Sequence, residues 1–137
     1  MVTREDIESF LDRLTAGGDG ASYSEVEPGL WVVHPTGGMD LDVVVHYSPP
    51  VVILRFKVMN VPTAEPVAAA LNRRLLQLNA TDLVHGSYGL ERDSVVLTEA
   101  LELAHLDYET FLASYEGMTL ALTAHLRDLA AFRNAQK

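Results

Sequence analysis

Residues 51–59 read Val-Val-Ile-Leu-Arg-Phe-Lys-Val-Met, and this stretch decides the fold. Leu54, Phe56 and Val58 fall on one face of an extended chain, and the two basic residues between them fall on the other, because successive side chains of a strand point to opposite faces. Only one face is therefore apolar. Such a strand is typical of an antiparallel sheet that is covered on one side only.

Neighbouring segments repeat this one-sided pattern. In Leu41–Tyr47 one face carries only Leu41, Val43, Val45 and Tyr47, and the other carries Asp42, Val44 and His46. Tyr23–His34 alternates less regularly around Pro28-Gly29, which predicts either one bulged strand or a tight hairpin. Later in the chain, Asp82–Leu90 and Ser94–Leu103 flank a turn and predict a second hairpin.

One residue conflicts with this second hairpin. Glu99 falls on the same face as the apolar residues of its strand. A carboxylate there would be buried in a covered sheet, so we expect it only at an edge or next to a bulge.

Three helices are predicted around the strands. The first follows Thr3, which can cap it together with Asp6 in a capping-box arrangement. The second covers residues 63–79, with an apolar residue at most turns. The last begins at Asp107, a favourable N-cap residue, and runs to about Arg133.

The chain is predicted to be one α+β domain over residues 1–137. The expected element order is α-β-β-β-α-β-β-α, with an antiparallel sheet of about five strands and the helices packed on one face. A composition of 48% hydrophobic and 21% charged residues indicates a globular chain.

No cysteine is present, which excludes disulfides and cysteine–zinc sites and suits a cytoplasmic protein. Neither a signal peptide nor a membrane-spanning run is expected.

The net charge of −9 is unevenly distributed. Residues 1–47 contain two basic and nine acidic residues, whereas residues 48–137 contain eight basic and ten acidic residues. An acidic surface repels phosphate backbones and attracts basic protein segments, so we expect no direct binding to nucleic acid. A second interpretation is that the negative charge only keeps the protein soluble.

No catalytic constellation, cofactor site or metal site is predicted. The five histidines form neither an H-E-x-x-H motif nor an i, i+4 pair on a helix, and no serine lies in G-x-S-x-G. Asp40 and Asp42 share a strand face, but nothing nearby could hold the phosphate that usually completes a magnesium site. We therefore expect a protein that is not an enzyme.

Four stretches of this sequence resemble one family. They are Pro49–Phe56 (Pro-Pro-Val-Val-Ile-Leu-Arg-Phe), the alanine-rich Val67–Leu78, Tyr88–Leu97 and Leu106–Glu109. The chain resembles, over nearly its whole length, the YbjN family of bacterial sensory-transduction-regulator-like domains, whose fold is similar to that of class I type III secretion chaperones. The resemblance implies a homodimeric, acidic, non-enzymatic domain that holds an extended segment of a client protein.

The function predicted from these observations is a chaperone-like protein-binding domain that holds a basic client, such as a nucleic-acid-binding protein, as a homodimer. The alternatives are a small-ligand sensor or regulatory domain with a pocket between sheet and helices, and a weak enzyme built from scattered residues. No membrane partner is expected.

Two surfaces are predicted to serve this function. An edge strand could accept a client strand, and apolar residues after it could hold a client's side chains; the candidates are Tyr23, Glu25, Glu27, Leu30, Trp31 and Val33. Trp31, the only tryptophan, is either a binding hot spot or a core aromatic residue. The dimer interface is predicted on the second helix and the Leu83–Leu103 hairpin, at Leu71, Leu75, Leu83, Tyr88 and Val96.

Overall fold

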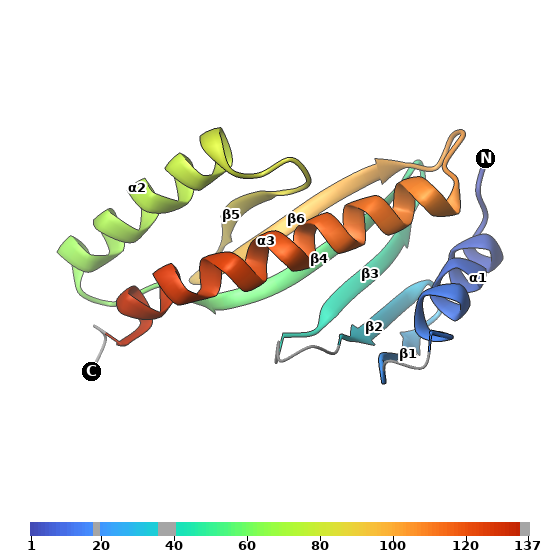
Figure 1. Cartoon of the computed structure of the whole chain (residues 1–137), viewed down its shortest axis with the longest axis horizontal. Helices are drawn as coiled ribbons and strands as arrows, with labels where there is room; N and C mark the ends of the chain where they lie inside the picture. The colour runs from blue at the N-terminus through green and yellow to red at the C-terminus, as the bar shows by residue number, and fades with distance from the viewer. Residues whose placement is uncertain (18–19, 36–40, 135–137) are drawn as a thin grey trace.

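A computed structural model describes residues 1–17, 20–35 and 41–134 (Figure 1). Its elements, in chain order, are α1 (Arg4–Thr15), β1 (Ser22–Glu27), β2 (Leu30–His34), β3 (Val43–Ser48), β4 (Val51–Asn60), α2 (Glu65–Thr81), β5 (Ser87–Glu91), β6 (Ser94–Glu102) and α3 (Tyr108–Asn134). The strands form one antiparallel sheet in the order β1-β2-β3-β4-β6-β5. The predicted α+β class and antiparallel sheet are confirmed.

The sheet has six strands rather than about five. The difference comes from Tyr23–His34, which is a hairpin and not one bulged strand. Gly29 has a φ of 80°, a conformation that glycine adopts without strain, and this lets the chain reverse directly after Pro28. β1 and β2 then pair with each other, with a register shift between Glu25 and Glu27.

The long helix α3 lies across one face of the sheet over β4 and β6, with α1 at the β1 end and α2 at the β5 end (Figure 1). The core lies between this face of the sheet and the helices. Its largest fully buried side chains include Trp31, Leu54, Phe56 and Leu97 of the sheet and Phe111, Met118 and Leu122 of α3. The alternation predicted for residues 51–59 is confirmed, because Leu54, Phe56 and Val58 are buried there.

The capping box of α1 is present as predicted. The Asp6 backbone N–H donates to the Thr3 hydroxyl at 3.2 Å, and the Thr3 backbone N–H donates to the Asp6 carboxylate at 2.9 Å. α2 starts at Glu65 and continues to Thr81, so Asn79 lies inside the helix instead of ending it. Its side-chain amide bonds both backbone groups of Tyr88 on β5, at 2.7 and 3.0 Å, and thereby fastens α2 to the edge of the sheet.

Asp107 caps α3, as predicted, by accepting a hydrogen bond from the Thr110 backbone N–H at 2.8 Å. The hydrogen bonds from the side chain and the backbone of Thr110 lower the pKa of Asp107 below its ordinary value of 3.8. Because the pKa is lowered in the folded state, this cap stabilises the protein above that ordinary value and is lost as the pH falls through the folded pKa.

We therefore expect Asp107→Asn, which keeps a capping oxygen but cannot ionise, to leave stability near neutral pH almost unchanged. Below the ordinary aspartate pKa of 3.8, the variant should lose stability less steeply than the wild type. Thermal melts across an acid pH series measure both. Parallel curves for the two proteins would contradict the prediction.

Glu99 lies where the edge interpretation allows a carboxylate. It stands in β6 opposite Leu54 of β4, one residue beyond Thr98, which is the last residue of β6 that pairs with β5. The Ser114 hydroxyl on α3 donates to its carboxylate, and His85 Nδ1 lies 3.7 Å from the same oxygen. Gly117 makes room for that imidazole, because a Cβ there would stand 2.6 Å from His85 Cδ2. These partners explain why a carboxylate is tolerated beneath α3.

Candidate functional site: the α3 groove

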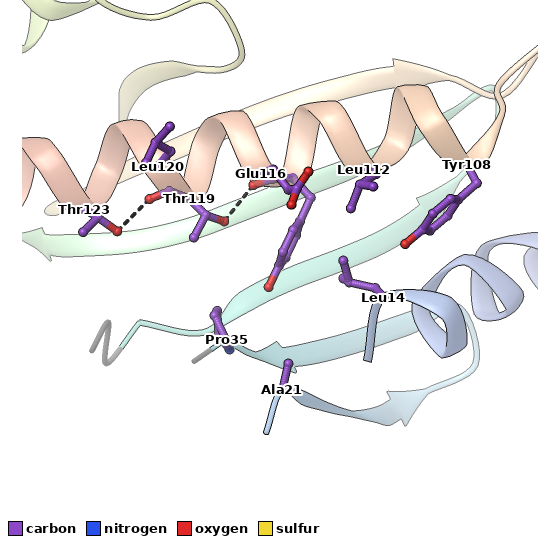
Figure 2. A pocket seen from close by; sticks show the side chains of 10 residues that line it. Leu14, Ala21, Pro35, Tyr108, Leu112, Glu116, Thr119, Leu120 and Thr123 are labelled. Atoms are coloured by element: carbon purple, nitrogen blue, oxygen red, sulfur yellow. Dashed lines mark hydrogen bonds between the residues drawn. The ribbon is translucent and has the colours of Figure 1, made fainter. Parts of the chain in front are cut away.

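A groove of about 790 Å³ runs beside α3, and we call it the α3 groove. One wall is α3 itself, from Tyr108 to Thr123, and the opposite wall contains Leu14 of α1 together with Ala21 and Pro35 (Figure 2). The groove therefore lies between the last helix and the two segments that lead into β1 and out of β2.

A second row of side chains on α3 forms part of the groove's lining. Tyr108, Leu112, Glu116 and Leu120 recur at every fourth residue, so they lie along one side of the helix. This side is distinct from the stripe that packs on the sheet. Leu120 is 75% exposed, although a leucine of this size usually packs against other residues. The groove thus presents apolar surface to water.

Aromatic contacts hold α1 at one end of the groove. The ring of Phe10 lies 5.5 Å from that of Phe111 and 5.8 Å from that of Tyr108, centroid to centroid. The Arg13 guanidinium stands 3.9 Å over the Tyr108 ring, a favourable cation–π geometry. The position of the α1 wall is therefore set by contacts with the first turns of α3.

The polar groups of the groove leave little for catalysis. The hydroxyls of Thr119 and Thr123 donate to carbonyl oxygens of α3 at 2.7 and 2.8 Å (Figure 2). Glu116 is the one carboxylate among the described lining residues, and no lysine, arginine or histidine stands among them. Such a surface suits the binding of apolar side chains better than proton transfer.

The described residues, 1–17, 20–35 and 41–134, contain neither a metal-binding cluster nor a membrane-spanning helix. No group of three or more histidine, cysteine or acidic residues is placed to hold a metal ion. No helix in this part of the chain is long and apolar enough to cross a membrane. Of the aspartates considered for magnesium, Asp42 is hydrogen-bonded to His34 Nδ1 at 2.8 Å, and Asp40 lies outside the described residues.

The predicted client residues of β1 are partly engaged with α1. The Tyr23 hydroxyl donates to Asp12, and this hydrogen bond, aided by burial, raises the pKa of Tyr23 to about 12. Glu25 accepts a hydrogen bond from Arg4 at 2.9 Å. Glu27 is exposed. β1 is nevertheless an outer strand of the sheet, as the edge-strand prediction requires.

The apolar residues of β2 that were predicted to bind a client are more buried than the predicted residues of β1. Trp31 and Val33 are fully buried on the helix-covered face, and Leu30, which alternates with them, is half-buried. A client could not touch Trp31 without opening the core. The structure thus places this residue among the core aromatics, the second of the two interpretations above.

The predicted dimer residues are also largely covered within the single chain. Leu71, Leu75, Tyr88 and Val96 are buried, and Leu83 is half-buried. The buried Tyr88 hydroxyl also forms a hydrogen bond of 2.7 Å with His125 Nδ1 on α3.

Apolar residues other than those predicted for the interface are exposed in this region. They are Leu76 on α2, 68% exposed, Val84 in the α2–β5 connection, 89% exposed, and Leu90 on β5, 54% exposed.

Sequence reasoning missed the α3 groove, although one signal was present. Leu112 and Leu120 stand outside the stripe that packs on the sheet and share a four-residue spacing with Tyr108. An amphipathic helix with a second apolar stripe has two faces to cover, and only one of them can meet the sheet.

Comparisons with known proteins agree with this fold. The CesT_Tir_1 family model matches residues 2–135. Among solved structures, the chain is similar to YbjN from E. coli, with 13% identity, a TM-score of 0.66 and 97% of each chain covered. It is also similar to a chain of the heterodimeric ExoU-SpcU complex from the type III secretion system of Pseudomonas aeruginosa, with 14% identity, a TM-score of 0.65, and 88% of this chain and 95% of that chain covered.

A chain of the ExsC-ExsE complex matches with 13% identity and a TM-score of 0.55, with 93% of this chain and 96% of that chain covered. No curated protein matches the chain. The predicted resemblance to YbjN and to the type III secretion chaperone fold is confirmed.

Proposed function

The chain belongs to the CesT_Tir_1 family, a type III chaperone family, and from this premise we propose that it is a non-enzymatic, chaperone-like domain that holds a segment of a client protein in the α3 groove. The observation that carries the proposal is the groove itself, whose lining includes Leu120, a leucine that is 75% exposed. Exposed apolar surface of this kind marks interaction sites. Solved structures of similar fold include the HopA1-SchA chaperone-effector complex, which supports a protein ligand.

The proposed client segment is basic. Residues 1–47, which supply the α1 wall, carry nine acidic and two basic residues. Residues 104–126, which comprise the turn before α3 and most of that helix, contain three acidic residues and no lysine or arginine. A basic segment would be steered toward this side of the molecule, and its association should slow as salt is added. The absence of cysteine fits a protein that works in the cytoplasm.

Site-specific photo-crosslinking tests the groove as the client site. A photoreactive phenylalanine analogue replaces Leu120 in the host cell, and the control carries it at Ala131, an exposed residue on the same helix beyond the groove. We expect a discrete adduct at position 120 only. The adduct partner, once purified, should bind the wild type and lose at least about tenfold in affinity with Leu120→Asp, since burying a leucine contributes about 1.5–3 kcal/mol.

The same purified partner should bind Ala131→Asp as tightly as it binds the wild type. Equal binding to wild type and Leu120→Asp would remove the α3 groove from the proposal. An adduct at position 131 and none at position 120 would do the same.

We further propose that the protein acts as a homodimer that pairs through α2 and β5. The chain exposes 7757 Å², whereas a compact monomer of 15.0 kDa exposes about 7000 Å². The surplus is close to the roughly 800 Å² that each partner buries in an interface of standard size. Leu76, Val84 and Leu90 are exposed in this region, and β5 is an outer strand.

The double variant Leu76→Asp/Leu90→Asp is expected to be a monomer at micromolar concentration, because two charges would have to be buried in the interface. Light scattering measures the mass, and the expected wild-type value is twice 15.0 kDa. Leu120→Asp serves as the matched control and should remain a dimer. A monomeric wild type, or a double variant that still dimerises, would refute this part of the proposal.

A further inference from the structure

We propose that Tyr88, His125 and Asp82 form a proton-sensitive clasp, which holds α2 and β5 against α3 while the imidazole is neutral and loosens them in mild acid. We call these three residues the His125 clasp. Its effect on the homodimer rests on the proposed function, whereas the clasp itself does not.

Both ring nitrogens of His125, on α3, have a partner from another element. Nδ1 lies 2.7 Å from the hydroxyl of Tyr88 on β5, and Nε2 lies 3.2 Å from the carboxylate of Asp82, the C-cap of α2. His125 and Tyr88 are each only 5% exposed. Asn79 ties β5 to α2 through the backbone of Tyr88. The imidazole therefore stands where α2, β5 and α3 meet.

The two partners determine which ring nitrogen carries the hydrogen. Hydrogen bonds from Thr81 and His125 lower the pKa of Asp82, so its carboxylate is ionised at neutral pH and can only accept. Burial raises the pKa of Tyr88, so its hydroxyl keeps its hydrogen and can donate. Nε2 is therefore the donor to Asp82, and Nδ1 accepts from Tyr88. In this neutral tautomer every hydrogen-bonding group of the clasp has a partner.

Protonation of the imidazole breaks this arrangement. Histidine ordinarily takes up a proton below about pH 6.5, and Nδ1 then becomes a donor. The Tyr88 hydroxyl must accept, and its own hydrogen is left in a buried place without a second partner among the described residues. The unpaired hydrogen costs more than the charged pair with Asp82 returns, because that carboxylate is half-exposed and screened by water.

The other charged groups around the imidazole do not offset this cost. Arg74 of α2 is close enough to Asp82 to help lower its pKa, and it is paired with Asp128 of α3 at 2.8 Å. On β6, the residue that pairs with Tyr88 is Leu97, which carries no charge. A protonated imidazole thus meets one carboxylate, and Arg74 already shares it.

The direction of the pH dependence follows from proton linkage. With α2 docked the imidazole is neutral, whereas an opened α2 exposes it to water, where it binds a proton below about pH 6.5. The docked state is therefore most stable above that pH and loses stability as the pH falls. One proton can change the opening equilibrium by at most about tenfold between about pH 7.5 and 5.5.

Amide hydrogen exchange of α2 in the full chain, corrected for the intrinsic effect of pH, tests the clasp. Between about pH 7.5 and 5.5 we expect the protection of α2 in the wild type to fall about three- to tenfold. His125→Gln can accept from Tyr88 and donate to Asp82 but binds no proton, so its protection should stay constant. The matched control is His46→Gln, at an exposed position of β3, which should respond like the wild type.

Tyr88→Phe separates the hydrogen bond from simple burial of the histidine. It removes the hydroxyl whose hydrogen is left unpaired, so its pH response should shrink to less than about twofold. Nitrogen NMR of the His125 ring should show the Nε2–H tautomer at about pH 7.5. A ring that is protonated at that pH, or an Nδ1–H tautomer, would overturn the inference. Equal pH responses of the wild type and His125→Gln would do so too.

Leu76 on α2 and Leu90 on β5 belong to the proposed dimer surface, so loosening of these elements should weaken the dimer. We expect the dimer dissociation constant of the wild type to rise at least about threefold on acidification, and that of His125→Gln to stay within about twofold. Hydrogen exchange of Leu76→Asp/Leu90→Asp measures the clasp without the dimer. A wild type that is monomeric at both pH values would remove the dimer, and the exchange data would still decide the clasp.

Discussion

Replacing Phe111 with alanine is expected to lower the free energy of unfolding by about 3–5 kcal/mol. The side chain is fully buried, and its ring packs against Phe10, so it joins α3 to α1. Truncation removes a large apolar group and leaves a cavity, because the flanking part of α3 is held in place by its other buried residues. A domain of this size has only about 5–15 kcal/mol in total. Urea denaturation measures the change.

Phe111→Leu is the matched control, because it keeps most of the apolar volume and should cost less than about 1.5 kcal/mol. The alanine variant should also loosen the α1 wall, since Phe10 loses one of its two aromatic partners. We therefore expect client binding to weaken even under conditions in which the variant remains folded. A loss below about 1 kcal/mol for Phe111→Ala would show that α1 can follow the missing ring into the cavity.

Replacing Ser114 with alanine is expected to cost about 1–3 kcal/mol, because it leaves a largely buried carboxylate without one hydrogen-bond donor. The Glu99 side chain is only 21% exposed beneath α3, so water cannot fully replace the missing hydroxyl. His85 remains as a partner at 3.7 Å, beyond normal hydrogen-bond length. The serine thus offsets part of the free-energy cost of removing the Glu99 carboxylate from water beneath α3.

A double-mutant cycle separates this interaction from simple packing. Glu99→Leu removes the carboxylate, and we expect it to change stability little, because an apolar side chain suits that position opposite Leu54. In the Glu99→Leu background, Ser114→Ala should cost much less than it does alone, which gives a coupling energy of about 1 kcal/mol or more. Equal costs of Ser114→Ala in the two backgrounds would show that the hydroxyl does not stabilise the carboxylate.

Most of the fold could be predicted because it depends on local patterns. The one-sided alternation at residues 51–59, the capping box at Thr3 and the N-cap at Asp107 each involve residues that are near one another in the chain. The Tyr23–His34 segment was ambiguous because a glycine after a proline fits both a bulge and a turn; the antiparallel pairing of β1 with β2 shows that it is a hairpin.

The groove and the environment of Glu99 could not be predicted in the same way, because both depend on residues far apart in the chain. Glu99 is tolerated through Ser114 on a helix and His85 in a loop, and no sequence pattern joins the three. The groove requires Leu14 of α1 to lie opposite α3, which depends on where α1 docks. For Trp31 the sequence left both a binding hot spot and a core aromatic open, and its complete burial places it in the core.

The attachment of α1 also constrains how the chain is made. The Val2 backbone N–H donates to the Leu103 carbonyl at 3.1 Å, and Phe10 packs on Phe111, so the first helix docks on residues that leave the ribosome about a hundred positions later. At a translation rate of about 5–20 residues per second, that delay is about 5–20 s. During this interval α1 lacks its contacts with α3, and a nascent chain should stay sensitive to proteases near its start until α3 emerges.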